Sequence, residues 1–166
     1  MDPGLDAVGR EQASAAARGL APLGPCPLYT SPLRRTRETA APLEALWGTA
    51  AVVDPAVGEI VSPTPDLAAR AAWLGEVMSS RWDQLGPDLL GWRDGVIGGL
   101  LAIASVVPVA VVVTHFIAIN VAVGEATGDR RVMCFAPDNC SRTVLEVDGG
   151  RLEVVESGHE AVTEVR

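Results

Sequence analysis

Three polar side chains in this sequence are of types that can handle a phosphoryl group. Arg35 belongs to a run of three arginines between residues 34 and 37, His115 directly follows the apolar segment 109–114, and Glu59 begins a loop. A guanidinium can hold phosphate through two parallel hydrogen bonds, and histidine and glutamate can exchange protons when their surroundings shift their pKa values. Each residue also has a plainer interpretation, as part of a solvated arginine face, a structural histidine or an exposed loop carboxylate.

The pattern of elements around these residues predicts where they lie. Helical spacing or caps are found at 6–20, with Asp6 as N-cap, and at 32–47, 66–85, 89–105 and from 118, with a loop at 58–65. Short β-branched or apolar runs predict strands at 28–30, 51–53, 109–114, 132–135, 142–147 and 152–155. This alternation predicts a three-layer α/β/α sandwich with a largely parallel central sheet, and the turn at 148–150 predicts an antiparallel hairpin at one edge.

In such folds ligands bind beyond the carboxyl ends of the strands. Arg35 follows the strand at 28–30 and His115 ends the strand at 109–114. We therefore expect both side chains at the same edge of the sheet.

Composition excludes several other classes of protein. The 166 residues, 48% of them apolar, fit one domain spanning 1–166, and a net charge of −8 argues against a nucleic-acid partner. Three cysteines without paired spacing suggest neither a disulfide framework nor a metal site, so a cytoplasmic location is the simplest expectation. The uncharged run 95–124 is long enough to span a membrane, but Pro108 divides it into a helix and a strand, so no membrane is expected.

Two sequence blocks resemble a known family. Ser31-Pro32-Leu33-Arg34-Arg35-Thr36-Arg37-Glu38-Thr39-Ala40 resembles the SPLxRxxxTA block of the histidine phosphatase (phosphoglycerate mutase-like) superfamily, and Leu5 to Ala13 resembles its LTxxGxxQA helix start. Val112-Val113-Thr114-His115 is similar to the strand that carries the family's second histidine. The resemblance implies Arg35 as substrate-binding residue, His115 as second histidine and Glu59 as the acid. It also implies a small phosphorylated molecule as partner, a phosphohistidine mechanism, and neither a metal nor an organic cofactor.

The sequence departs from the family pattern before residue 5. The family's nucleophilic histidine lies in an RHG motif on a first strand ahead of the LTxxGxxQA helix, and only Met1-Asp2-Pro3-Gly4 precede that helix here. We therefore expect an N-terminally truncated domain without the usual first strand. His159, in the tail, is not expected to replace the nucleophile, and Phe116 stands where the family has glycine.

Two alternatives follow from this departure. In one, the natural protein begins further upstream and contains the motif, and it is a phosphatase or mutase. In the other, the chain is a catalytically inactive relative that binds phosphate or serves as an interaction module, and its exposed strand edges favour a homodimer.

Overall fold

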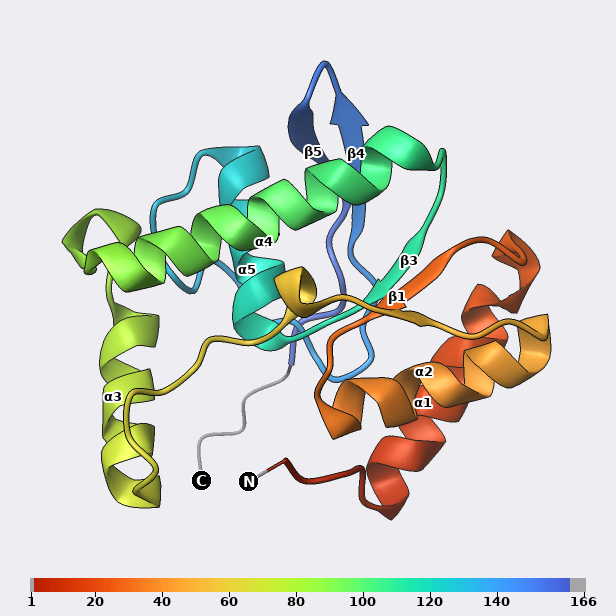
Figure 1. The fold of residues 1–166 in the computed structure, drawn as a ribbon, viewed down its shortest axis with the longest axis horizontal. Coiled ribbons are helices and arrows are strands. Elements are labelled where there is room, and N and C mark those ends of the chain that lie inside the picture. Colours follow the sequence, from red (N-terminus) through yellow and green to blue (C-terminus); the bar gives the residue numbers. More distant parts are fainter. Residues whose placement is uncertain (1, 162–166) are drawn as a thin grey trace.

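The computed structural model describes residues 2–161, and a parallel sheet lies at its centre (Figure 1). Its strands are β1 (Leu28–Thr30), β2 (Val52–Val53) and β3 (Val111–Val113), in the order β2-β1-β3. Tyr29 is in register with Val52 on one side and Val112 on the other. The α/β fold with a parallel central sheet, predicted from the sequence, is confirmed.

Two helices cover one face of this sheet. α1 (Ala7–Leu20) and α2 (Arg34–Trp47) contribute Ala17, Ala40 and Leu43 to a buried cluster with Leu28 of β1. Asp6 caps α1 as predicted, because its side chain accepts a hydrogen bond of 2.7 Å from the amide of Gly9. Burial of these apolar side chains holds α2 against the sheet. Because α2 follows β1 in the chain, its arginine run begins near the end of that strand.

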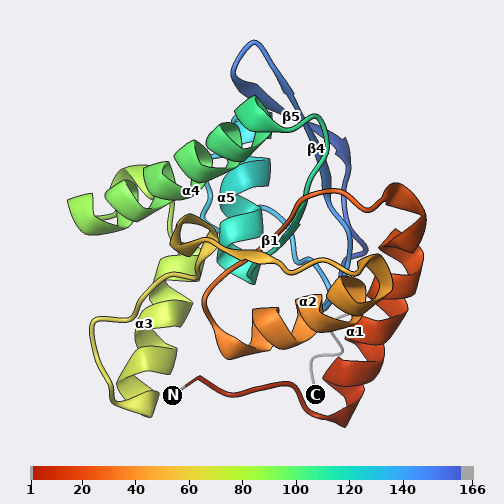
Figure 2. The ribbon, with the colours of Figure 1, turned by 45° about the vertical axis from the view of Figure 1, so that its right-hand side comes forward.

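The remaining helices surround a second core on the other side of β1 and β3 (Figure 2). They are α3 (Leu67–Ser79), α4 (Pro87–Val106) and α5 (Phe116–Thr127). This core contains Val77, Trp82, Val96, Ile117 and Val121. Because α5 starts immediately after His115, this histidine lies two residues beyond the end of β3 and is the N-cap of a helix.

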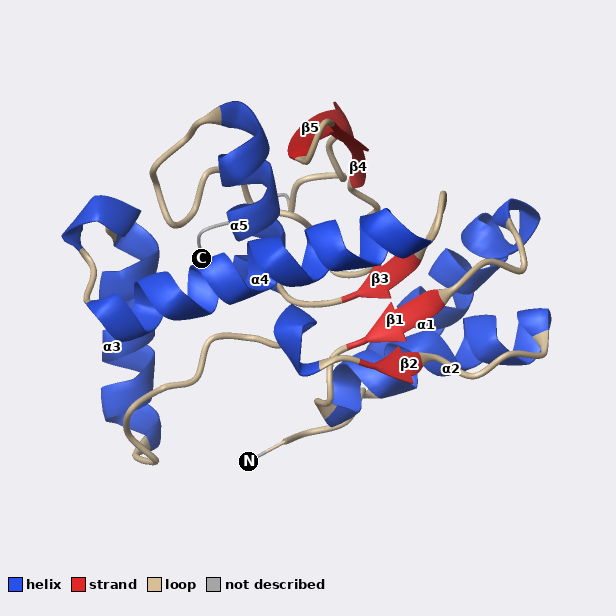
Figure 3. Ribbon diagram, turned by 45° about the horizontal axis from the view of Figure 1, so that its top comes forward, coloured by secondary structure: helices blue, strands red, loops and turns tan. Residues whose placement is uncertain are grey.

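A separate hairpin completes the described chain. β4 (Val144–Asp148) and β5 (Arg151–Glu156) pair antiparallel, and β5 packs against α5. Gly149 and Gly150 have φ of 53° and 80°, the left-handed conformation that glycine adopts without strain, so the predicted turn is confirmed. The sequence predicts the hairpin at one edge of the central sheet, but it forms a separate two-stranded sheet. Within residues 2–161 no strand pairs with the edge of β3 that faces away from β1, as the strand view in Figure 3 illustrates.

One predicted strand is wrong. Residues 132–135 form a loop, because the buried Asn120 side chain accepts hydrogen bonds from the amides of Cys134 (2.8 Å) and Phe135 (3.1 Å). The Asn120 amide group donates in turn to the carbonyl of Phe116 at 3.0 Å. The loop amides therefore find their partners on a helix side chain rather than on a neighbouring strand.

Several helix boundaries also differ from the prediction. The helix expected to reach residue 85 ends at Ser79, and a 3-10 turn, η3 (Trp82–Gln84), follows it. α2 begins two residues later than expected, and α5 begins two residues earlier, at Phe116. The early start of α5 matters for the site, because it brings the helix N-terminus next to His115.

The apolar run 95–124 is divided as predicted. α4 is long and apolar enough to cross a membrane by length and composition, but it ends at Val106, and strand β3 follows. In the fold α4 packs against α5 and the 3-10 turn η2 (Pro55–Val57). Gly99 allows this close approach, because a Cβ there would lie 2.6 Å from the Cβ of Ala56. α4 thus supports the segment that leads into Glu59.

Replacing Asn120 with alanine is expected to destabilise the protein. The substitution leaves two loop amides without their acceptor in a buried position, which costs about 2–3 kcal/mol of unfolding free energy. Asn139→Ala, in an exposed turn, is the matched control and should change the stability by less than about 0.5 kcal/mol. Urea denaturation of both variants measures the difference, and equal stabilities would contradict the proposed role of Asn120.

Candidate active site

The centre of the site is a contact between Arg35 and His115. His115 is 6% exposed, and its Nδ1 lies 3.0 Å from Nη2 of Arg35. A guanidinium can only donate, so Nδ1 accepts this hydrogen bond and the ring proton of the neutral imidazole sits on Nε2. Nε2 lies 2.7 Å from Oγ of Ser31 and donates to it. The two predicted residues therefore meet, and a third residue fixes the ring.

Ser31 is that third residue, and the sequence analysis assigned it no role. It is fully buried beyond β1, and its amide donates to the carbonyl of Val113 at 3.2 Å. Its hydroxyl oxygen accepts from the amide of Leu33 at 3.1 Å and lies 3.1 Å from the hydroxyl of Thr36. One signal could have found it: Ser31 follows β1 as His115 follows β3, and adjacent parallel strands end side by side.

Burial and charge keep His115 neutral. Desolvation, and after it the nearby Arg35 charge, lower the pKa of His115 to about 4, while Asp2 acts in the opposite direction. The ring therefore accepts from Arg35 and donates to Ser31 at neutral pH. Because the unfolded chain binds this proton more tightly, His115 favours the folded state above about pH 6.5, and this contribution is lost as the pH falls towards 4.

Glu59 reaches the same edge from the segment after η2. Its Oε1 accepts from the amide of Ile60 at 2.9 Å, and its Oε2 accepts from the amide of Ile117, in the first turn of α5, at 3.3 Å. The hydroxyl of Thr114 donates to the carbonyl of Val57 at 2.6 Å and ties this segment to the end of β3. The structure therefore places Glu59 beside the helix that begins at His115.

The surroundings of Glu59 favour its protonated form. Desolvation raises the pKa of this carboxyl, and the two amide hydrogen bonds and the Arg35 charge only partly oppose it. A carboxyl group with a raised pKa can carry a proton to a leaving oxygen near neutral pH. Burial thus shifts the Glu59 carboxyl towards its protonated form relative to an exposed glutamate.

The three neighbouring arginines have different surroundings. Arg34 pairs with Glu38 at 2.7 Å, Arg35 contacts His115, and Arg37 is exposed. Only Arg35 therefore points into the site, and the interpretation as a uniformly solvated face does not hold for it.

Asp2 is a second residue that the sequence analysis missed. Leu33, the N-cap of α2, has no capping side-chain bond. The Asp2 carboxylate instead accepts from the amide of Arg34, at 3.0 Å for one oxygen and 2.9 Å for the other. A carboxylate at the positive end of a helix stabilises it. Asp2 therefore anchors the start of the described chain beside Arg35.

The other sequence candidates do not enter this cluster. His159 is exposed, and its carbonyl accepts from the amide of Asp138 at 2.8 Å. None of the described hydrogen bonds joins the His159 ring to Arg35, His115 or Glu59. Within residues 2–161, no group of three or more His, Cys, Asp or Glu side chains is arranged to hold a metal ion.

The chain matches one family and several solved structures. The family model described as histidine phosphatase superfamily (branch 1) matches residues 1–159. A mycobacterial glucosyl-3-phosphoglycerate phosphatase is similar with a TM-score of 0.72 and 20% identity, over 97% of this chain and 90% of that one. Bacillus stearothermophilus YhfR has a TM-score of 0.78 and 17% identity, over 93% and 84% of the two chains. These likenesses show the fold.

Two further relatives extend the comparison. A phosphoserine phosphatase from Entamoeba histolytica, solved with phosphoserine, has a TM-score of 0.71 and 19% identity, over 94% of this chain and 84% of that one. The PE-PGRS family protein PE_PGRS11 of Mycobacterium tuberculosis is 49% identical over 59 residues, or 35% of this chain. The chain spans about a tenth of the length of this curated relative, since the match covers 10% of it.

Removing the Arg35 charge is expected to raise the pKa of His115. Arg35→Met keeps much of the side-chain length but removes the cation that opposes protonation of the ring. We expect the His115 pKa to move upward from about 4 in an NMR titration of the imidazole nitrogens. Arg37→Met, an exposed arginine on the same helix, should leave it unchanged. An unaltered or lower His115 pKa in Arg35→Met would exclude the electrostatic contact.

Proposed function

Because the chain belongs to the histidine phosphatase superfamily, branch 1, we propose that Arg35, His115 and Glu59 form the phosphate-handling half of a phosphoryl-transfer site. The observation that carries the proposal is the contact of Arg35 with His115, at the carboxyl ends of parallel strands and beside the carboxyl group of Glu59. The substrate is a small phosphomonoester. Similarity in fold to phosphatases of glucosyl-3-phosphoglycerate and of phosphoserine supports this class of substrate without selecting a member of it.

Each residue has a defined task in the proposed reaction. Arg35 turns its donors from Nδ1 of His115 to the phosphate oxygens. The phosphate charge then raises the pKa of His115, so Nδ1 takes up a proton and donates it to another phosphate oxygen while Nε2 stays bonded to Ser31, and charge on the phosphoryl group is stabilised. A nucleophilic imidazole forms the nitrogen–phosphorus bond while the bond to the ester oxygen breaks, and Glu59 gives that oxygen its proton. Water then attacks phosphorus, passes its proton to Glu59 and releases phosphate, which restores both groups.

In this proposal the nucleophile comes from a strand that lies N-terminal to Met1 in the natural protein. The chain has two histidines, one already engaged by Arg35 and one exposed in the tail. The edge of β3 that faces away from β1 has no strand partner within the described residues. A parallel strand added there would end beside His115, where an attacking imidazole is required. Finding an in-frame RHG motif upstream of Met1 would support this, and an in-frame stop codon directly upstream would contradict it.

The second candidate function is a catalytically inactive phosphate-binding or interaction module. The specific observation in its favour is that, within residues 2–161, no second imidazole contacts His115 or Arg35. Such a protein would bind phosphate without breaking an ester bond, and the unpaired edge of β3 could pair with a second copy in a homodimer. For either function we propose a cytoplasmic protein without a nucleic-acid or membrane partner.

Phosphate binding tests the shared part of both functions. Arg35→Ala and His115→Ala should each weaken the binding of inorganic phosphate roughly tenfold to a hundredfold, because each removes a donor to a charged acceptor. Arg37→Ala, on the same helix but exposed, is the control and should bind phosphate normally. Isothermal titration calorimetry measures the three affinities. If neither the Arg35 variant nor the His115 variant weakens phosphate binding, the proposed site is refuted.

A turnover assay then tests whether the present chain is itself catalytically active. With p-nitrophenyl phosphate as substrate, release of nitrophenol by the present chain that is lost in His115→Ala would eliminate the inactive module. Phosphate binding without any turnover would eliminate catalysis by the present chain.

Glu59→Gln provides a sharper test of the acid once a catalytically active form is available. Glutamine cannot supply a proton, so kcat for phenyl phosphate, with its poor leaving group, should fall about 100-fold or more. The fall should be smaller for p-nitrophenyl phosphate, whose leaving group needs little protonation. Equal losses for both substrates would assign Glu59 a role other than proton donation.

A further inference from the structure

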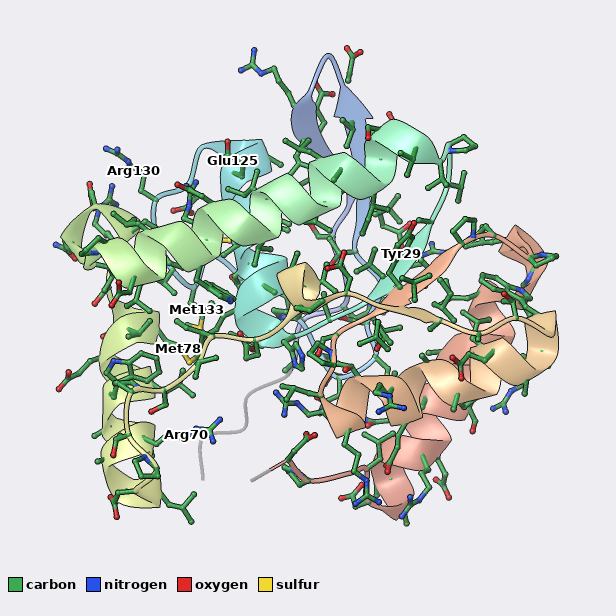
Figure 4. All side chains as sticks on the ribbon, in the orientation of Figure 1. Tyr29, Arg70, Met78, Glu125, Arg130 and Met133 are labelled. Carbon is green, nitrogen blue, oxygen red and sulfur yellow. The ribbon has the colours of Figure 1, made fainter. Side chains whose placement is uncertain are left out.

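A mainly apolar cavity adjoins the phosphate-handling residues. It has a volume of about 220 Å³, and α3 supplies one wall with Arg70, Trp73, Leu74 and Met78. Figure 4 shows Arg70 and Met78 projecting from α3 to the same side, towards the body of the molecule. Glu59 and Phe116 belong to the opposite wall. Within the described residues, Glu59 and Arg70 are the charged side chains of this lining.

Glu59 joins the cavity to the phosphate-handling residues. It lines the cavity, its carboxylate is held by the first turn of α5, and the charge of Arg35 acts on it. In the proposed reaction the acid protonates the ester oxygen, which is the atom between phosphorus and the leaving alcohol. If Arg35 and His115 hold the phosphoryl group, the carbon side of the ester extends past Glu59 into this cavity.

Phe116 lies between the phosphate-handling residues and the cavity, because it follows His115 in the chain and lines the cavity. It is the residue between His115 and Ile117, whose amide holds Glu59, and it stands where the resemblance predicts glycine. Its ring packs against the core around α3 and also lines the cavity. A side chain absent from the family pattern therefore adds apolar surface at the point where the leaving group would begin.

From these contacts we propose that the cavity binds the alcohol portion of the substrate and that this alcohol is apolar and aromatic. The inference rests on the proposed function and names its substrate class. Indole, phenyl, thioether and isobutyl groups line most of the cavity, and they would bury a polyhydroxylated alcohol at the cost of its hydrogen bonds to water. An aromatic ring loses no such bonds and stacks favourably against Trp73 and Phe116.

The size of the cavity agrees with this class. An apolar cavity of about 150 Å³ is known to hold one benzene molecule, so about 220 Å³ accommodates a single substituted ring. An aryl or benzyl phosphomonoester therefore fits, with its ring between α3 and Phe116 and its phosphate at Arg35.

Binding of two phosphonates to the present chain tests the inference without requiring turnover. Benzylphosphonate carries an aromatic ring and methylphosphonate does not, so benzylphosphonate should bind about tenfold to a hundredfold more tightly in calorimetry. Trp73→Ala removes part of the wall and Leu74→Trp fills the cavity, and both should bring the ratio of the two affinities towards one. The control is Leu67→Ala: the Leu67 side chain lies on the same helix and is 62% exposed, so its loss should leave the ratio unchanged.

The outcomes separate the two proposals. Equal affinities for the two phosphonates, both weakened by Arg35→Ala, would overturn the aromatic subsite and leave the proposed function standing. A large ratio that neither Trp73→Ala nor Leu74→Trp reduces would also overturn the subsite. If Arg35→Ala weakens the binding of neither phosphonate, the proposed function fails and this inference fails with it.

Discussion

The hydrogen-bonded chain from Ser31 through His115 to Arg35 is the interaction on which the site depends. It crosses from the end of β1 to the end of β3 and returns to the first turn of α2, so it needs the parallel pairing of these strands and the placement of α2 directly after β1. A shift of one residue in either strand would turn the Ser31 or His115 side chain to the opposite face of the sheet. The register of these two three-residue strands therefore determines whether Ser31, His115 and Arg35 meet.

The second constraint is the helix that begins at His115. Since α5 starts with Phe116, its first amides point towards the end of β3, and the amide of Ile117 holds Glu59 there. The Asn120 side chain fixes the same helix to the loop around Cys134, which secures its orientation from the other side. The short helix α5 therefore contributes both to the core, through Ile117 and Val121, and to the site, through its contact with Glu59.

The sequence predicts the parts of this arrangement that are local. Residue types and spacing are enough to predict Asp6 as a cap and the break at Pro108. They also predict the strands that precede Arg35 and His115. The bond between Ser31 and His115 joins residues 84 positions apart, so no local pattern could reveal it. The same holds for the capping of α2 by Asp2 and for the Asn120 contacts that replace the strand predicted at 132–135. Resemblance to a family supplied Glu59, whose own sequence neighbourhood is that of an ordinary loop acid.

Burial affects the two titratable groups of the site in a coordinated way. It lowers the pKa of His115 and raises that of Glu59, so both are driven towards their neutral forms while Arg35 keeps its charge. If the site binds phosphate as proposed, the dianion meets the cation of Arg35 and a Glu59 carboxyl whose pKa is raised by burial. The charge of the dianion would raise the pKa of both His115 and Glu59 further, which favours proton donation by both groups. In the proposed reaction, desolvation of these two groups thus serves both the binding of an anion at Arg35 and proton donation by Glu59.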